Sequence, residues 1–105
     1  MLVDHIAPPY YAVIFSSLLS EDTEGYAETA DRMEQLAKQQ KGFLGIESAR
    51  SEIGITVSYW ETLEAITAWK NNVAHTEVQK LGKEKWYQKY QLRICKIERA
   101  YGFEK

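Results

Sequence analysis

The sequence has little cysteine and proline and no long apolar stretch. It contains one cysteine, Cys95, and two prolines in 105 residues. A single cysteine excludes an intramolecular disulfide and a metal site built only from thiolates. No stretch approaches the roughly 20 apolar residues of a membrane-spanning helix. The first residues, MLVDHIAPPYY, also lack the basic region and apolar core of a secretion signal. We therefore expect a cytoplasmic protein.

The chain also lacks an excess of charge of either sign. Thirteen Lys and Arg residues stand against fifteen Asp and Glu residues, which gives a formal charge of −2. This balance provides no whole-molecule attraction to phosphate backbones or anionic lipids. We therefore expect neither a nucleic acid nor a membrane as partner. The lysines between residues 80 and 89 are interrupted by glutamate, which is typical of a solvated helix face.

The first 42 residues predict a strand and a helix. Residues 10–19, YYAVIFSSLL, follow a Pro-Pro pair and are rich in aromatic and β-branched side chains, as strands are. In the next segment Ser20, Asp22 and Thr23 are candidate helix caps, and Gly42 can end the helix in the left-handed conformation. Apolar residues at helical spacing predict one buried stripe, made of Tyr26, Ala30, Met33, Leu36 and Ala37.

The middle of the chain predicts a β-hairpin. Residues 43–50 and 53–61 read as strands, and the link between them is too short for anything except an antiparallel pair. The second strand alternates, so its side chains separate onto two faces. One face carries Ile53, Ile55, Val57 and Tyr59, and the other carries Gly54, Thr56, Ser58 and Trp60. The small residues of the second set leave room above the sheet.

The last part of the chain predicts helical cover and a final strand. Thr62 is a candidate cap for a second helix, whose buried face holds Leu63, Ile66, Trp69 and Val73. After the Asn71-Asn72 pair, residues 75–81 form a short helix that is expected to end at Gly82. Residues 87–101 have the apolar and β-branched density of a last strand.

This order predicts one α+β domain over residues 1–105, with residues 1–9 as a flexible tail. A β-α-β-β-α-β order is the ferredoxin-like arrangement, in which both helices cover one face of a four-stranded antiparallel sheet. The other face of the sheet then needs a cover that a single chain does not provide. A homodimer that packs sheet against sheet is the simplest solution.

Three segments carry a resemblance to a known family. They are the strand-to-helix stretch SYWETLEAITAW, the histidine six residues after Trp69, and GKEKWYQKY before the last strand. From Tyr11 to Phe103 the chain resembles the antibiotic biosynthesis monooxygenase family, within the dimeric α+β barrel superfamily. The resemblance implies a ferredoxin-like subunit, a homodimer, and a pocket between each sheet and its own helices. Some relatives oxidise polyketide-derived phenols with molecular oxygen, without metal or flavin, and others degrade haem.

A cofactor-free oxygenase must form an electron-rich substrate anion in a space that excludes bulk water. This chemistry calls for a proton acceptor, aromatic walls and a few hydrogen-bonding groups. We expect His75 as the acid/base and Trp69 as a wall, because His75 titrates near neutral pH and is the only histidine outside the N-terminal tail. The candidate substrate contacts are Trp60, Tyr59, Ser58, Asn72 and Trp86. No cofactor and no metal are expected.

Structural roles compete with these assignments. His75 can simply begin a short helix, and Trp69 can fill the core on the inner face of its helix. Tyr59 and Trp60 leave their strand on opposite faces, so at most one of them faces a given pocket. Trp86 can serve dimer or edge packing.

Haem degradation is a weaker alternative. The haem-degrading relatives carry an Asn on the first strand and an axial histidine about ten residues after the helix tryptophan. Here YYAVIFSS contains no Asn, and the histidine follows Trp69 by six residues. These departures disfavour haem as substrate or ligand.

Two functions of different class remain open. The first is a cofactor-independent monooxygenase that acts on a small aromatic or quinone-like metabolite. The second is a non-enzymatic dimeric protein that binds a small ligand or serves a stress response, since the sequence shows no nucleophile-base pair and no convergent polar cluster.

Overall fold

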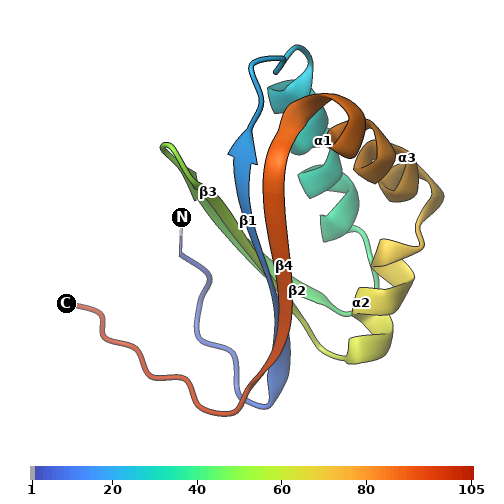
Figure 1. The fold of residues 1–105 in the computed structure, drawn as a ribbon. Coiled ribbons are helices and arrows are strands. Elements are labelled where there is room, and N and C mark those ends of the chain that lie inside the picture. The colour runs from blue at the N-terminus through green and yellow to red at the C-terminus, as the bar shows by residue number, and fades with distance from the viewer. Residues whose placement is uncertain (1) are drawn as a thin grey trace.

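The chain folds into a four-stranded antiparallel sheet with helices on one face (Figure 1). The computed structural model describes residues 2–105, apart from the side chain of Val73. The elements in chain order are β1 (Tyr10–Leu19), α1 (Tyr26–Lys38), β2 (Phe43–Arg50), β3 (Gly54–Trp60), α2 (Leu63–Lys70), α3 (Val73–Leu81), the π-helix η1 (Gly82–Trp86) and β4 (Tyr87–Ile97). The strand order is β2-β3-β1-β4. The predicted ferredoxin-like α+β class is therefore confirmed.

The sheet register places the two predicted faces of β3 on opposite sides of the sheet. Ser58 lies opposite Val13 of β1, which in turn lies opposite Ile94 of β4. Trp60 lies two residues further along β3 on the same side as Ser58, and its ring stacks on Trp69 of α2. The small-residue column of β3 therefore faces the helices, as the alternation of the sequence predicted.

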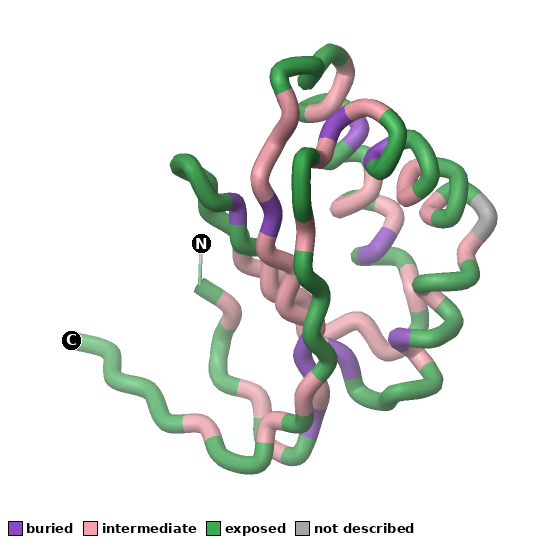
Figure 2. The backbone as a smooth tube through the Cα atoms, in the orientation of Figure 1, coloured by how far each residue is buried: buried purple, intermediate pink, exposed green. Residues whose placement is uncertain are grey.

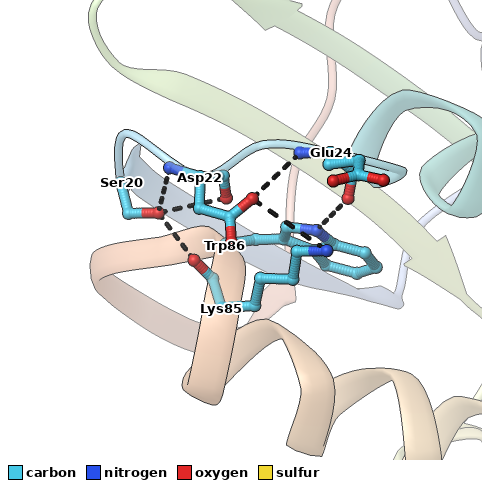
Figure 3. Close-up of polar contacts among 5 residues, drawn as sticks. All are labelled: Ser20, Asp22, Glu24, Lys85 and Trp86. Atoms are coloured by element: carbon cyan, nitrogen blue, oxygen red, sulfur yellow. Dashed lines mark hydrogen bonds and ion pairs between the residues drawn. The ribbon is translucent and has the colours of Figure 1, made fainter.

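The first helix begins later than predicted, and its predicted caps serve a turn instead. α1 begins after Gly25, which adopts a positive φ of 78° and provides no side-chain cap. The Ser20 hydroxyl accepts a hydrogen bond from Asp22 N and donates to the Lys85 carbonyl oxygen at 2.6 Å (Figure 3). The assignment of Ser20, Asp22 and Thr23 as caps is thus wrong, because the first two tie the β1–α1 connection to the segment before β4.

The predicted buried stripe of α1 is correct except at one position. Tyr26, Met33 and Leu36 are half-buried and Ala37 is buried, but Ala30 is exposed. Thr29 is buried in its place. At this position the buried face of α1 is therefore shifted by one residue from the predicted stripe, and the small side chain of Thr29 takes the buried place.

Gly42 forms the turn from α1 into β2. Its φ is 86°, and a Cβ at this position would lie 2.7 Å from Cβ of Ala65 in α2. Both the left-handed backbone and the close approach require glycine. The turn predicted at Gly42 is therefore confirmed, and it also brings α2 against the end of α1.

The second helix has the predicted cap but a narrower buried face. The Thr62 side chain accepts a hydrogen bond from Ala65 N at 3.0 Å. Ile66 is buried and Trp69 is half-buried, whereas Leu63 is 47% exposed. The prediction that Leu63 is buried is wrong, because this first residue of α2 leaves about half of its side chain in solvent. The Val73 side chain lies outside the described part of the chain.

The third helix, α3, ends at Leu81 as predicted, but the backbone remains helical through Gly82. Gly82 is buried and has helical angles of φ −59° and ψ −45°, and the chain continues as one π-helical turn to Trp86. A Cβ on Gly82 would approach the Tyr87 ring to 2.8 Å. The glycine therefore serves close packing and not helix termination. The last strand also ends earlier than predicted, at Ile97 and not near residue 101.

Both terminal segments lie on the side of the sheet away from the helices (Figure 1). Residues 98–105 form no helix or strand and are mostly exposed (Figure 2). The side chains of Tyr101 and Phe103 are 88% and 90% exposed. At the other terminus, Val3 N–H donates to the Glu47 carboxylate at 2.9 Å. This bond attaches the N-terminal segment to β2, so the flexibility expected for residues 1–9 stays a prediction.

Candidate functional site

Three rings form a stack from the sheet into the helical layer. Trp60, at the end of β3, is 0% exposed, and its ring centroid lies 6.2 Å from that of Trp69 in α2 at an interplanar angle of 26°. His75, in the first turn of α3, stacks on the other side of Trp69 with centroids 4.1 Å apart and an angle of 13°. The stack therefore joins three elements that the sequence alone could not place together.

Asn72 sets the position of His75. The Asn72 side chain caps α3 by accepting a hydrogen bond from His75 N at 3.3 Å. A cap of this kind satisfies one of the free N–H groups in the first turn of a helix. The Asn71-Asn72 break thus turns the chain so that a histidine six residues after Trp69 returns to lie over the indole ring.

The hydrogen bonds of His75 define its tautomer. Its Nδ1 lies 2.9 Å from the Trp69 carbonyl oxygen. A carbonyl can only accept, so Nδ1 must carry the proton in the neutral ring. Gln79 Nε2, 3.1 Å from Nδ1, cannot donate to a protonated nitrogen and instead donates to the Lys70 carbonyl oxygen at 3.3 Å. Nε2 has no hydrogen-bond partner among the described residues, so its lone pair is available to an incoming group.

Burial keeps His75 neutral. Desolvation lowers the pKa of His75 below its ordinary value of 6.5, and the bond to the Trp69 carbonyl opposes this shift. Desolvation disfavours the imidazolium because a charged ring loses more hydration than a neutral one. At neutral pH the ring is therefore a neutral base with Nε2 as its acceptor atom.

Ser58 completes the group. Its hydroxyl oxygen accepts a hydrogen bond from Trp60 Nε1 at 2.9 Å. This bond satisfies the only polar atom of a fully buried indole. Ser58 is half-buried on the helix-facing side of β3. Five of the seven predicted site residues thus gather in one region, namely Ser58, Trp60, Trp69, Asn72 and His75.

Tyr59 does not join this group, because it points to the opposite face of the sheet. Its hydroxyl donates to Glu47 Oε1 at 2.7 Å, and its ring meets Tyr10 edge to face with centroids 5.8 Å apart. Burial first, and then the bond to Glu47, raise the pKa of Tyr59 to about 12. The two hydrogen bonds from Val3 and Tyr59 lower the pKa of Glu47. These residues line a hollow of about 970 Å³ between the two terminal segments.

Trp86 also lies apart from the stack, at the N-terminal end of α1. Its indole N–H donates to the Glu24 carbonyl at 2.8 Å (Figure 3), and its ring contacts Tyr26 edge to face. Only 3% of the side chain is exposed. The geometry therefore places Trp86 in the packing between η1 and the start of α1.

Two polar residues of the sheet were not predicted from the sequence. Glu47 is held by Tyr59 and by the N-terminal segment, and Arg50 lies directly across from Gly54 at the turn end of the hairpin. The pairing of residues across the predicted hairpin could have indicated Glu47 as a neighbour of Tyr59. The pairing of residues 50 and 54 places residue 47 opposite residue 57, and therefore diagonal to Tyr59 on the same face.

The fold and the ring stack define the class of protein. It is a ferredoxin-like α+β domain with a half-buried neutral histidine held against a tryptophan in the helical layer. The chain belongs to the antibiotic biosynthesis monooxygenase family, whose family model matches residues 9–81.

One protein of similar sequence and two solved structures of the same fold illustrate what this chain resembles. The chain is 48% identical over 99 residues to the uncharacterized protein YqjZ of Bacillus subtilis strain 168, and the match covers 92% of this chain and 87% of that protein. SnoaB, a cofactor-independent oxygenase from Streptomyces nogalater, has the same fold with a TM-score of 0.75 at 7% identity, covering 87% of this chain and 95% of SnoaB. A protein from Shewanella oneidensis gives a TM-score of 0.78 at 12% identity, over 91% of this chain and 98% of that one.

Residues 2–105 contain neither a candidate membrane-spanning helix nor a candidate metal site. No helix there is both long and apolar enough to cross a membrane. No group of three or more His, Cys, Asp or Glu side chains in the same residues is placed to hold a metal ion.

Proposed function

We propose that the protein is a cofactor-independent monooxygenase that oxidises a small aromatic or quinone-like metabolite, with His75 as the base. The observation that supports this most directly is the bond from His75 Nδ1 to the Trp69 carbonyl at 2.9 Å. It fixes the tautomer and leaves Nε2 free. The family assignment is consistent with this chemistry.

The residues of the stack suit the first step of such a reaction. Nε2 of neutral His75 accepts a proton from an electron-rich phenol or an acidic methylene, and the resulting anion reacts with oxygen. One oxygen atom stays on the substrate carbon and the other leaves as water. Trp69 offers a flat surface for the aromatic substrate, and Ser58 is a polar group close to Trp60.

Oxygen consumption by the pure protein tests this proposal. Protein treated with a chelator is mixed with a panel of hydroquinones and anthrones, and an oxygen electrode records the initial rate. The His75→Ala and Trp69→Ala variants are expected to lose at least about tenfold in rate, as removal of a general base commonly costs 10²–10⁴-fold. His5→Ala is the matched control because His5 is the other histidine and lies in the N-terminal segment. Rates in His75→Ala equal to those in His5→Ala would refute the assignment of the base.

A ligand-binding protein without turnover is the second candidate. It is favoured by the surroundings of His75. Its hydrogen-bond partners within the described chain are the Trp69 carbonyl and the Asn72 side chain, and no carboxylate there stabilises an imidazolium. Native mass spectrometry that shows a retained aromatic compound, together with no oxygen uptake, would favour this function. Haem binding is tested separately, by titrating the protein with haem and recording the absorbance of the Soret band.

We also propose that two copies associate through the sheet face opposite the helices. This face carries apolar residues, and Ile55 on it is 46% exposed. The C-terminal segment that carries Tyr101 and Phe103 borders the same face, and both rings are exposed. Burial of such surface contributes about 25 cal/mol per Å², so a second copy gains much by covering it. Sedimentation velocity at micromolar concentration tests this proposal, and a stable 12.2 kDa species would contradict it.

A further inference from the structure

Arg50 forms a second polar site on the helix-facing side of the sheet, far from His75. It lies at the end of β2 across from Gly54, and Gly54 is six residues from Trp60 along β3. At about 3.3 Å per residue this separation is about 20 Å. A group bound at Arg50 is therefore distinct from the ring stack.

The guanidinium of Arg50 is held in place on one side. Nη2 donates to the Ser17 hydroxyl at 2.6 Å and to the Tyr26 hydroxyl at 3.3 Å, and Nη1 donates to the Ser17 carbonyl at 3.4 Å. The guanidinium lies against Gly54, where a Cβ would clash with it. These contacts use three of the five N–H donors of the side chain, so Nε–H and one Nη1–H have no partner among residues 2–105.

No carboxylate within residues 2–105 neutralises this charge. The ion pairs of the described chain are Lys38 with Glu34 and Lys85 with Asp22, and neither involves Arg50. The three acceptors that hold the guanidinium are uncharged. An arginine with fixed geometry and free N–H donors is well suited to a carboxylate, to which charge-assisted hydrogen bonds are about twice as strong as neutral ones.

One aromatic ring packs against the exposed guanidinium, and further rings continue from it. Its Cζ lies 5.6 Å from the centre of the Tyr26 ring. Phe15 lies next in the cluster, with ring centroids 5.3 Å from Tyr87 and 5.1 Å from Tyr90. All four rings are half-buried, so each keeps some surface that a ligand can reach. Burial, and then the bond with Tyr26, raise the pKa of Tyr87, so this phenol stays a hydrogen-bond donor.

We propose that Arg50, Ser17 and Tyr26, together with the ring of Phe15, form a binding site for an aromatic carboxylate. The guanidinium binds the carboxylate through its charge and one free N–H group, and the ligand ring packs against the half-buried aromatic side chains. The chain as a whole carries a formal charge of −2, so any preference for an anion must come from this local arrangement.

Isothermal titration calorimetry with two matched probes tests the proposal. 2-Naphthoate carries the carboxylate, and 2-naphthamide has nearly the same shape without the charge. The wild-type protein is expected to bind the acid at least tenfold more tightly than the amide. Arg50→Gln is expected to abolish this preference, and Arg50→Lys to reduce it because a lysine cannot keep the same three bonds. Gly54→Ala displaces the guanidinium and should act like Arg50→Gln.

Control variants show whether the preference for the acid belongs to Arg50. Arg93→Gln removes the same charge from β4 on the opposite face and should leave the preference unchanged. Thermal unfolding followed by circular dichroism checks that each variant folds, and Tyr26→Phe replaces Arg50→Gln if that variant does not. His75→Ala should bind 2-naphthoate like the wild type, since the assay requires no oxidation.

Four results with the two probes and the arginine variants would overturn the proposal, and a fifth concerns His75. The four are equal affinity of the wild type for acid and amide, no binding of either probe up to millimolar concentration, unchanged affinity in Arg50→Gln, and an equal loss in Arg93→Gln. Loss of naphthoate binding in His75→Ala would also overturn it, by placing the ligand at the ring stack. A failure here leaves the oxidation proposal standing, because oxygen uptake depends on His75 and is measured separately.

Discussion

The lowered pKa of His75 predicts how the stability of the protein depends on pH. The half-buried ring is neutral in the folded state, and it regains full hydration on unfolding. Below the ordinary histidine pKa of 6.5 the unfolded chain therefore binds a proton that the folded chain resists. The stability that neutral His75 contributes is present above about pH 6.5 and is lost as the pH falls through the lowered value.

The size of the effect has a clear upper limit. One proton taken up on unfolding changes the free energy of unfolding by at most about 1.4 kcal/mol per pH unit. Carboxylates titrate mostly below pH 5, so between pH 5 and 7 the wild-type slope reports chiefly on histidine. His75→Gln keeps an amide N–H for the Trp69 carbonyl but loses the ring that stacks on Trp69, so this variant should be less stable than the wild type at pH 8.0. Its profile should be flatter because glutamine does not titrate.

Urea unfolding followed by tryptophan fluorescence measures the profile at pH 5.0, 6.0, 7.0 and 8.0. His5→Gln is the control, and its profile should run parallel to that of the wild type. If the reaction proposed above takes place, kcat/KM should fall on the acid side with the pKa of His75 in the free enzyme. Parallel unfolding profiles for wild type and His75→Gln would refute the reasoning, since His75 would then have the same pKa in both states.

Three other predictions follow from the packing. Gly42→Ala should lower the free energy of unfolding by about 2–4 kcal/mol, from its left-handed φ and the close approach of Ala65; a loss below about 0.5 kcal/mol in urea unfolding would contradict this. Tyr59 should ionise near a pKa of about 12 in an ultraviolet titration of wild type minus Tyr59→Phe, because burial and Glu47 favour the neutral phenol. The stability from this phenol is present below pH 10 and lost toward 12, and a midpoint near 10 would argue against the observed bond. Trp86→Phe should cost about 2 kcal/mol in thermal or urea unfolding, through a smaller buried ring and an unmatched backbone carbonyl; wild-type stability would contradict it.

The local patterns of the sequence were enough for the order of elements and the faces of the strands. Alternation along residues 54–60 separates Ser58 and Trp60 from Tyr59 because a strand places successive side chains on opposite sides. The cap at Thr62 and the left-handed turn at Gly42 were equally readable, since both depend on one residue and its neighbours.

The site itself depended on contacts between elements, which local patterns do not determine. The stacking of His75 on Trp69 requires the turn at Asn72, and no periodicity specifies the direction in which a helix leaves a break. Ser20 and Trp86 are 66 residues apart, yet Ser20 N donates to the Trp86 carbonyl at 2.7 Å.

The sequence by itself thus determined the order of the elements, the sheet faces and the family, because each depends on neighbouring residues or on a motif. Only the tertiary structure decided which side chains meet, that Tyr59 and Trp86 lie away from His75, and that Arg50 has no carboxylate partner within the described chain. The physical reason is that a side chain's pKa and hydrogen bonds are set by what surrounds it in space, and most of those neighbours are distant in sequence.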